Sequence, residues 1–287
     1  MRTSWKLTVV TLASLGLGVS LPAEEADFAY CESKLRTYSE WELGRGRQFM
    51  LELESSSGGA LYLYGAEHSY SPAEFQNSYI EEAFGRFGPT RLYFEGHETG
   101  VGPSREQTIE DHGEPGLVRF LASAEGLPAS TLEPEPYDEV SYLVERFGAE
   151  KVELFFVLRE TVRLRERRGL SQEELHQAIA RLQQSSTLPG SPGLIRSIDE
   201  LEESFWKYWN YPHLWSGARP EWFNPYYESA RTGGVFTNEI ARASSEFRNR
   251  HMYRVLTEAV RDGHRVFAVV GRDHVPMQAP ALRCALE

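Results

Sequence analysis

The chain has 287 residues with a hydrophobic content of 41%, which is enough for one sizeable core. It contains 30 basic and 42 acidic residues and has a formal net charge of −12. An acidic surface of this kind argues against nucleic acid or an anionic membrane as a partner.

The first 23 residues have the pattern of a secretory signal peptide. Arg2 and Lys6 precede an apolar stretch over residues 7–21, and Ala23 and Ala26 are small residues near which cleavage can occur. The stretch is short for a membrane span of about 20 residues, although a retained anchor is the alternative. We therefore expect an exported protein, periplasmic or extracellular, with no membrane contact after cleavage and with residues 24–287 as the mature chain.

Two cysteines, Cys31 and Cys284, lie close to opposite ends of the mature chain. In an oxidising compartment they can pair and close a very long loop, and two buried thiols are the alternative. Two cysteines so far apart do not suggest a cysteine-based metal site.

Strands and helices are expected to alternate through the first third of the chain and up to about residue 132. The apolar pattern predicts strands at 49–54, 61–64, 91–94 and 129–132, a hairpin turn at 55–59, and helices at 72–87 and 113–125. Strands about 30 residues apart with helices between them indicate a mainly parallel sheet flanked by helices, the α/β class.

The middle of the chain is helical and charged from about residue 138 to 203, and then rich in aromatic residues from 205 to 227. The aromatic residues form either a packed cap over the core or a groove that stacks on an extended substrate. We interpret residues 138–230 as a helical insertion or lid within a single α/β domain that covers residues 24–287.

The last α/β unit combines a helix at 246–262 with a strand at 265–270. A helix that leads directly into a parallel strand begins at the edge of the sheet where that strand ends. Arg248 and Asn249 should therefore lie beside the loop that follows the strand.

One short motif, GxxH, occurs twice, from Gly65 to His68 and from Gly271 to His274. Each copy follows a predicted strand and precedes a predicted helix. The carboxyl ends of parallel strands meet at one edge of the sheet, where such sheets bind ligands. His68 and His274 are therefore expected to meet there and to be able to share a metal ion.

The arrangement resembles the TraB/Tiki family, within a wider group that includes the ChaN-type haem-binding lipoproteins and the erythromycin esterases. The resemblance rests on the two GxxH motifs, on Glu95 at the end of the strand at 91–94, and on the Arg248-Asn249 pair at a helix start before the second motif. It covers roughly residues 60–133 and 235–286.

The resemblance implies an α/β fold built from two related halves and, for the Tiki branch, a peptidase activity that depends on a divalent metal. Position by position, it implicates His68, Glu95, Arg248 and His274 in that activity.

Two imidazoles and one carboxylate, from His68, Glu95 and His274, would form a metal shell with one position open for water. A divalent ion such as Mn, Co or Zn suits this set of ligands, and His97 is a possible additional ligand.

Four further residues are assigned to catalysis. Glu67 or Glu133 would act as general base. Arg248 would stabilise an oxyanion, with Asn249 beside it, although a structural salt bridge across the sheet edge is the alternative role for this arginine.

The leading hypothesis is an exported metal-dependent hydrolase that acts on peptide bonds, with a peptide or small molecule as substrate. One alternative is a protein of the ChaN type that binds haem or another ligand without catalysis. Another is an esterase-like hydrolase that uses a carboxylate and a histidine without metal.

Overall fold

The computed structural model of the chain describes residues 23–38, 40, 49–184 and 193–287. The predicted signal segment, residues 1–23, lies outside this part of the chain except for its last residue. Among the described residues, no helix combines the length and the apolar composition needed to cross a bilayer.

Within the described chain, five strands form one sheet in the order β1-β2-β5-β3-β4. The strands are β1 (Met50–Glu54), β2 (Ala60–Ala66), β3 (Arg91–Phe94), β4 (Ala129–Thr131) and β5 (Arg265–Gly271). β1 and β2 are antiparallel, and the other neighbouring pairs are parallel. The α/β class, the hairpin and the mainly parallel sheet are thus confirmed, and every strand end lies within two residues of the expected one.

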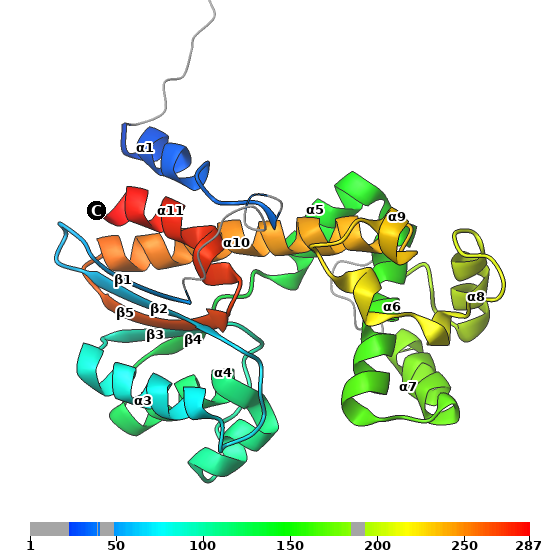
Figure 1. The fold of residues 1–287 in the computed structure, drawn as a ribbon, viewed down its shortest axis with the longest axis horizontal. Coiled ribbons are helices and arrows are strands. Elements are labelled where there is room, and N and C mark those ends of the chain that lie inside the picture. The colour runs from blue at the N-terminus through cyan, green and yellow to red at the C-terminus, as the bar shows by residue number, and fades with distance from the viewer. Residues whose placement is uncertain (1–22, 39, 41–48, 185–192) are drawn as a thin grey trace, which may run out of the picture.

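Helices cover both faces of the sheet (Figure 1). One face packs against α1 (Ala23–Glu32), α10 (Thr237–Arg261) and α11 (His274–Leu286), and the other against α3 (Phe75–Phe87) and α4 (Arg105–Glu125). Neighbouring strand residues point to opposite faces. Leu61 and Leu63 therefore join the first core, while Tyr62 joins the second.

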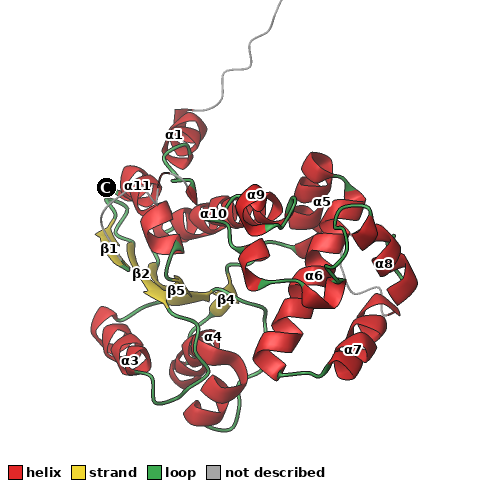
Figure 2. Ribbon diagram, turned by 45° about the vertical axis from the view of Figure 1, so that its right-hand side comes forward, coloured by secondary structure: helices red, strands yellow, loops and turns green. Residues whose placement is uncertain are grey.

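A group of helices lies beside the sheet, as Figure 2 shows from a second angle. These are α5 (Pro136–Phe147), α6 (Ala149–Arg168), α7 (Gln172–Gln184), α8 (Ile198–Trp206), η1 (Trp215–Gly217), η2 (Pro220–Phe223) and α9 (Ser229–Thr232). Apart from α9, they share a hydrophobic core with the first half of α10, and its residues run from Val140 to Ala243. Buried Trp209 and Trp222 stack in this core at 5.2 Å between ring centroids, so packing accounts for much of the aromatic segment.

Two helices begin earlier than the sequence pattern predicts. α10 starts at Thr237 and not near Glu246, because its first half packs in the helical core through Ile240 while its second half packs on the sheet through Met252. A helix that changes cores midway has no single apolar stripe. Arg248 therefore lies in the middle of α10 and not at a helix start.

The second early helix is α4, which starts at Arg105 and is broken at Gly113. Gly113 has a φ of 66°, which favours glycine, and a β-carbon there would lie 3.0 Å from the carbonyl oxygen of Ser69. The predicted helix at 113–125 therefore corresponds to the second half of α4, and the turns before Gly113 were missed.

Candidate active site at the carboxyl edge of the sheet

The two GxxH motifs lie side by side at the ends of β2 and β5. Gly65 is paired with Val270 and Ala66 with Gly271, and the amide of Arg272 donates to the carbonyl of Ala66 at 2.9 Å. A β-carbon on Gly65 would lie 2.9 Å from backbone atoms of Arg272, so glycine is needed for the close approach of the two loops. The structure thus brings the two motifs together, as their positions predict.

His68 is oriented by a carboxylate on α4. Its Nδ1 forms a short hydrogen bond with Oε1 of Glu114, whose side chain is only 4% exposed. The amide of Ser69 donates to the other oxygen of Glu114 at 3.3 Å. With Nδ1 held in this way, Nε2 faces Gly271.

His274, the first residue of α11, is oriented by an amide on α10. Its Nδ1 lies 2.7 Å from Oδ1 of Asn249, and both side chains are buried. Because Oδ1 only accepts hydrogen bonds, Nδ1 carries a proton. Nε2 of His274 lies 3.4 Å from Oε1 of Glu95. Asn249, which the sequence places among the catalytic residues, thus contacts His274 directly.

Glu95 follows β3 and is buried between the two motifs. Its Oε2 accepts from the amide of Gly271 at 2.5 Å, and its Oε1 accepts from Nη2 of Arg248 at 2.5 Å. Burial by itself would raise the pKa of Glu95, but the charges of His274 and Arg248 and the hydrogen bonds lower that pKa well below its usual value. Glu95 is therefore an ionised carboxylate at neutral pH.

The three expected metal ligands converge on Gly271. A β-carbon built on this glycine would lie 3.0 Å from Oε2 of Glu95, 3.4 Å from Nε2 of His68 and 3.5 Å from Cδ2 of His274. These side chains therefore surround one small space. As placed, no group of three or more His, Cys, Asp or Glu side chains among the described residues has the geometry to hold a metal ion.

Arg248 joins buried Glu95 to partly buried Glu133 across the edge of the sheet. Its Nε donates to Glu133 at 2.8 Å, and its Nη2 donates to Glu133 at 2.6 Å and to Glu95 at 2.5 Å. Burial favours the neutral guanidine, but Glu95, Glu133 and Glu139 raise the pKa of Arg248 above its usual value. The structural salt bridge expected as one of the two roles of Arg248 is present, while the catalytic roles of Arg248 and Glu133 stay predictions.

Glu67 and His97 lie further from this convergence. The Glu67 side chain is exposed and bonds Arg272 of the second motif, so it ties the two motif loops together. His97 is exposed on the loop after β3.

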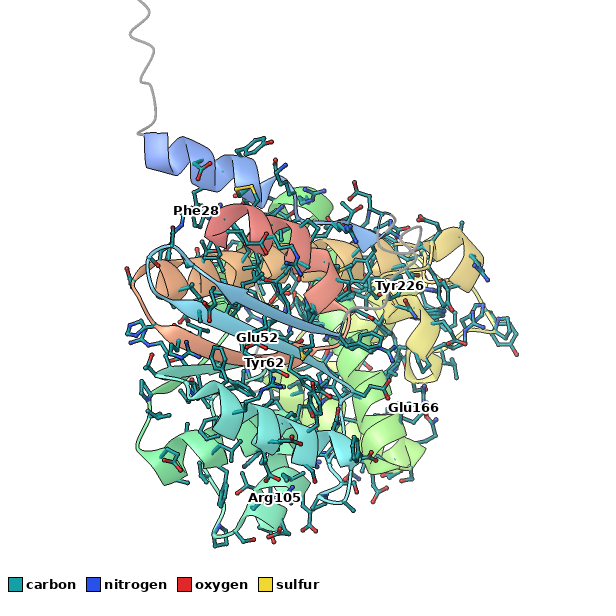
Figure 3. The ribbon with its side chains drawn as sticks, turned by 60° about the vertical axis from the view of Figure 1, so that its left-hand side comes forward. Phe28, Glu52, Tyr62, Arg105, Glu166 and Tyr226 are labelled. Atoms are coloured by element: carbon teal, nitrogen blue, oxygen red, sulfur yellow. A yellow bond between two sulfur atoms is a disulfide. The ribbon has the colours of Figure 1, made fainter. Side chains whose placement is uncertain are left out.

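A cavity of about 550 Å³ lies over the motifs. Its floor is the sheet edge with His68, Glu95 and His274, and its opposite wall is the segment 220–226 from the helical part of the chain. Figure 3 marks Tyr226 of this wall, on the opposite side of the view from Phe28 of α1. Tyr38, from the N-terminal segment, completes the lining.

Sequence patterns did not identify Glu114, Tyr38 or the wall at 220–226. The helix start at Gly113-Glu114-Pro115 was visible, but nothing in it indicated that Glu114 turns toward His68. For Tyr38 the sequence contains no signal, because its place depends on a contact with residues more than 200 positions away.

No protein-family model, no curated protein and no solved structure matches this chain. The resemblance to the TraB/Tiki family therefore rests on the motifs alone.

Proposed function

We propose that the protein is an exported metal-dependent hydrolase that acts on peptide bonds at the carboxyl edge of its sheet. One observation carries the proposal. Nδ1 of His68 and Nδ1 of His274 are each held by an oxygen acceptor, and both rings border the space at Gly271 that Glu95 also borders.

The types of residue present, and the way in which the two imidazoles are held, suit a divalent metal. Histidines that ligate metals usually donate their other ring nitrogen to a carboxylate or an amide oxygen, as Glu114 and Asn249 accept here. Two imidazoles and an ionised carboxylate suit Zn, Mn or Co and leave a position for water. Bound there, such an ion would supply Lewis-acid activation of that water.

Arg248 and Glu67 have different roles in this proposal. Arg248 holds Glu95 and Glu133 in place through its hydrogen bonds, and its charge helps to lower the pKa of Glu95. Glu67, at the rim of the cavity, is the candidate general base, because its exposed carboxylate needs only to leave Arg272 to accept a proton.

The helical part would act as a lid. Residues 220–226 supply Pro220, Phe223 and Tyr226 to the cavity wall, where they would exclude water from a bound peptide.

We also infer that the two strand-GxxH-helix units are related halves, because β2 and β5 are parallel neighbours whose motifs lie in nearly the same register.

A metal-independent esterase is the second candidate, and the pair of His68 and Glu114 favours it. A buried carboxylate that fixes Nδ1 leaves Nε2 to take a proton from water, as in serine hydrolases, where the base is oriented in the same way.

The test is elemental analysis of protein purified without added metal, followed by two assays. A quenched-fluorescence peptide library and p-nitrophenyl acetate are each tried with and without EDTA, and then with Mn, Co or Zn restored. We expect bound metal and peptide cleavage that EDTA abolishes and the metal restores. Ester cleavage unaffected by EDTA would favour the second candidate. A Soret band on haem titration with neither activity would favour a ligand-binding protein.

A further inference from the structure

Tyr38 is the one cavity residue that comes from the N-terminal segment of the described chain. Its side chain is 6% exposed, although it lies just beyond a stretch of loop. This buried tyrosine therefore lines the same cavity as the candidate catalytic groups.

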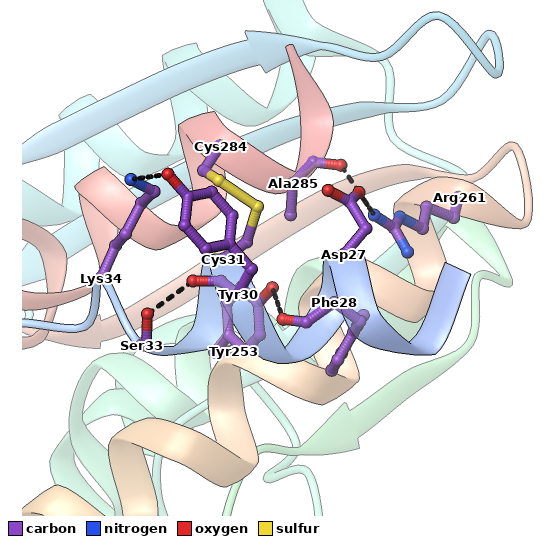
Figure 4. The surroundings of a disulfide bond; sticks show 10 residues. All are labelled: Asp27, Phe28, Tyr30, Cys31, Ser33, Lys34, Tyr253, Arg261, Cys284 and Ala285. Carbon is purple, nitrogen blue, oxygen red and sulfur yellow. Dashed lines mark hydrogen bonds and ion pairs between the residues drawn. A yellow bond between two sulfur atoms is a disulfide. The ribbon is translucent and has the colours of Figure 1, made fainter. Parts of the chain in front are cut away.

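The segment that carries Tyr38 is anchored to α11. Cys31 and Cys284 form a disulfide with 5.4 Å between their α-carbons, which decides between the two alternatives for these cysteines (Figure 4). Five residues later, the amide of Arg36 donates to the carbonyl of Met277 at 2.9 Å. The disulfide and this hydrogen bond hold the segment along α11, so that it runs from the C-terminal end of the helix toward the cavity.

The Tyr38 ring and hydroxyl are both held in place. The ring meets Tyr226 of the opposite wall edge-on, with 4.8 Å between centroids. The hydroxyl forms a short hydrogen bond with Oγ of Ser245, one turn before Asn249 on α10. Because a serine hydroxyl can donate to the phenolic oxygen, the tyrosine can keep its own proton for a third group.

The hydroxyl stays protonated at neutral pH. Burial raises the pKa of Tyr38 to about 12, with further contributions from Asp273 and Glu95, while Ser245 and Arg248 oppose the rise. The charges of Glu95, Asp273 and Arg248 all act on this hydroxyl, so it lies within the electrostatic field of the site.

We propose that the Tyr38 hydroxyl donates a hydrogen bond to the carbonyl oxygen of a bound acyl substrate, an amide or an ester, and stabilises the negative charge that develops there. This inference rests on the proposed hydrolase function. The proton stays on Tyr38, so no covalent change at the tyrosine is involved.

The test compares Tyr38→Phe with Tyr253→Phe on the best peptide from the library screen. Each change removes the hydroxyl of one buried tyrosine. Tyr253 lies on α10 and does not line the cavity, and its hydroxyl donates to the carbonyl of Phe28 on α1 at 3.2 Å (Figure 4). We expect Tyr38→Phe to lower kcat by about 100-fold with little change in KM, the usual effect of losing one such donor. Tyr253→Phe should keep kcat within about twofold, and both variants should retain the metal content of the wild type.

The pH profile adds a second readout. Because the hydroxyl does not titrate near neutrality, the ratio of the wild-type rate to the Tyr38→Phe rate should be constant between about pH 6 and pH 9. Full kcat in Tyr38→Phe would overturn the inference and leave the hydrolase proposal intact. Equal losses in both variants would also overturn it, since a loosened N-terminal segment would then be the cause. A wild type with no activity on peptides or esters would remove both proposals together.

Discussion

Nδ1 of His68 is bonded to the buried carboxylate of Glu114, which is 46 residues further along the chain. The bond joins the first GxxH motif to the break in α4 at Gly113. The bond fixes the orientation of the His68 imidazole without a bound ligand. The direction in which His68 faces the site therefore depends on Glu114, a residue of another element.

Replacing the carboxylate should therefore weaken the site without removing a ligand. We expect Glu114→Gln to lower metal affinity by about 10- to 100-fold, the usual cost of losing such a partner. Competition with a chromogenic chelator measures this affinity. Glu110→Gln, at an exposed position on the same helix, is the matched control and should bind as the wild type does. Unchanged affinity in Glu114→Gln would argue that His68 is not a ligand.

His68→Ala and His274→Ala should each abolish stoichiometric metal binding, measured by elemental analysis after dialysis. His264→Ala is the control, because His264 lies just before β5, at the end opposite Gly271. Circular dichroism should show all three variants folded. A His68→Ala or His274→Ala protein with full occupancy would rule out a shared site.

Gly271→Ala tests the space between the ligands. Its new methyl group would lie 3.0 Å from Oε2 of Glu95 and 3.4 Å from Nε2 of His68, so it would fill the space that the expected ligands surround. We expect metal affinity to fall by at least about tenfold. In Gly85→Ala, where nothing lies within 4 Å of the added carbon in α3, affinity should be unchanged and stability should rise by about 0.5–1 kcal/mol.

Arg248→Lys separates the structural role of this residue from a catalytic one. Lysine keeps the charge but loses the planar fork that reaches Glu133 and Glu95, so we expect a loss of about 2 kcal/mol in the free energy of unfolding. Arg254→Lys, at a surface pair with Glu32 where the arginine side chain is 58% exposed, should cost under about 1 kcal/mol.

The same Arg248→Lys preparation is assayed for turnover. A destabilised protein with full activity in its folded fraction would assign Arg248 to structure alone. A drop in kcat that exceeds the loss of folded protein would support its contact with the reacting carbonyl.

Removing the disulfide should affect both stability and the site. The bond closes a loop between residues 253 positions apart, for which loop entropy predicts a contribution of about 5 kcal/mol to stability. The double variant Cys31→Ser, Cys284→Ser should melt at a lower temperature. Below its melting point it should also lose kcat, because the segment with Tyr38 is then held only by weaker contacts. Intact mass of the non-reduced wild type checks that no free thiol is present.

Much of the fold follows from the sequence by itself. Apolar runs separated by helical patterns predicted each strand of the sheet to within two residues, because strand periodicity and turn residues are local properties. The sequence also placed His68, Glu95 and His274 at one edge, since residues that follow parallel strands share that edge.

The tertiary structure alone decided how those side chains are oriented. Glu114 and Tyr38 reach the site through contacts between elements far apart in the chain, and no local pattern encodes such contacts. Asn249 was expected beside the second motif, but only the structure shows that it orients His274. The sequence left the pairing of Cys31 with Cys284 open. The tertiary structure decides it, because α1 and α11 pack on the same face of the sheet and bring the two cysteines together. The predicted start of α10 was wrong for a related reason. Its two halves face different cores, so its apolar residues form no single stripe that a sequence pattern can follow.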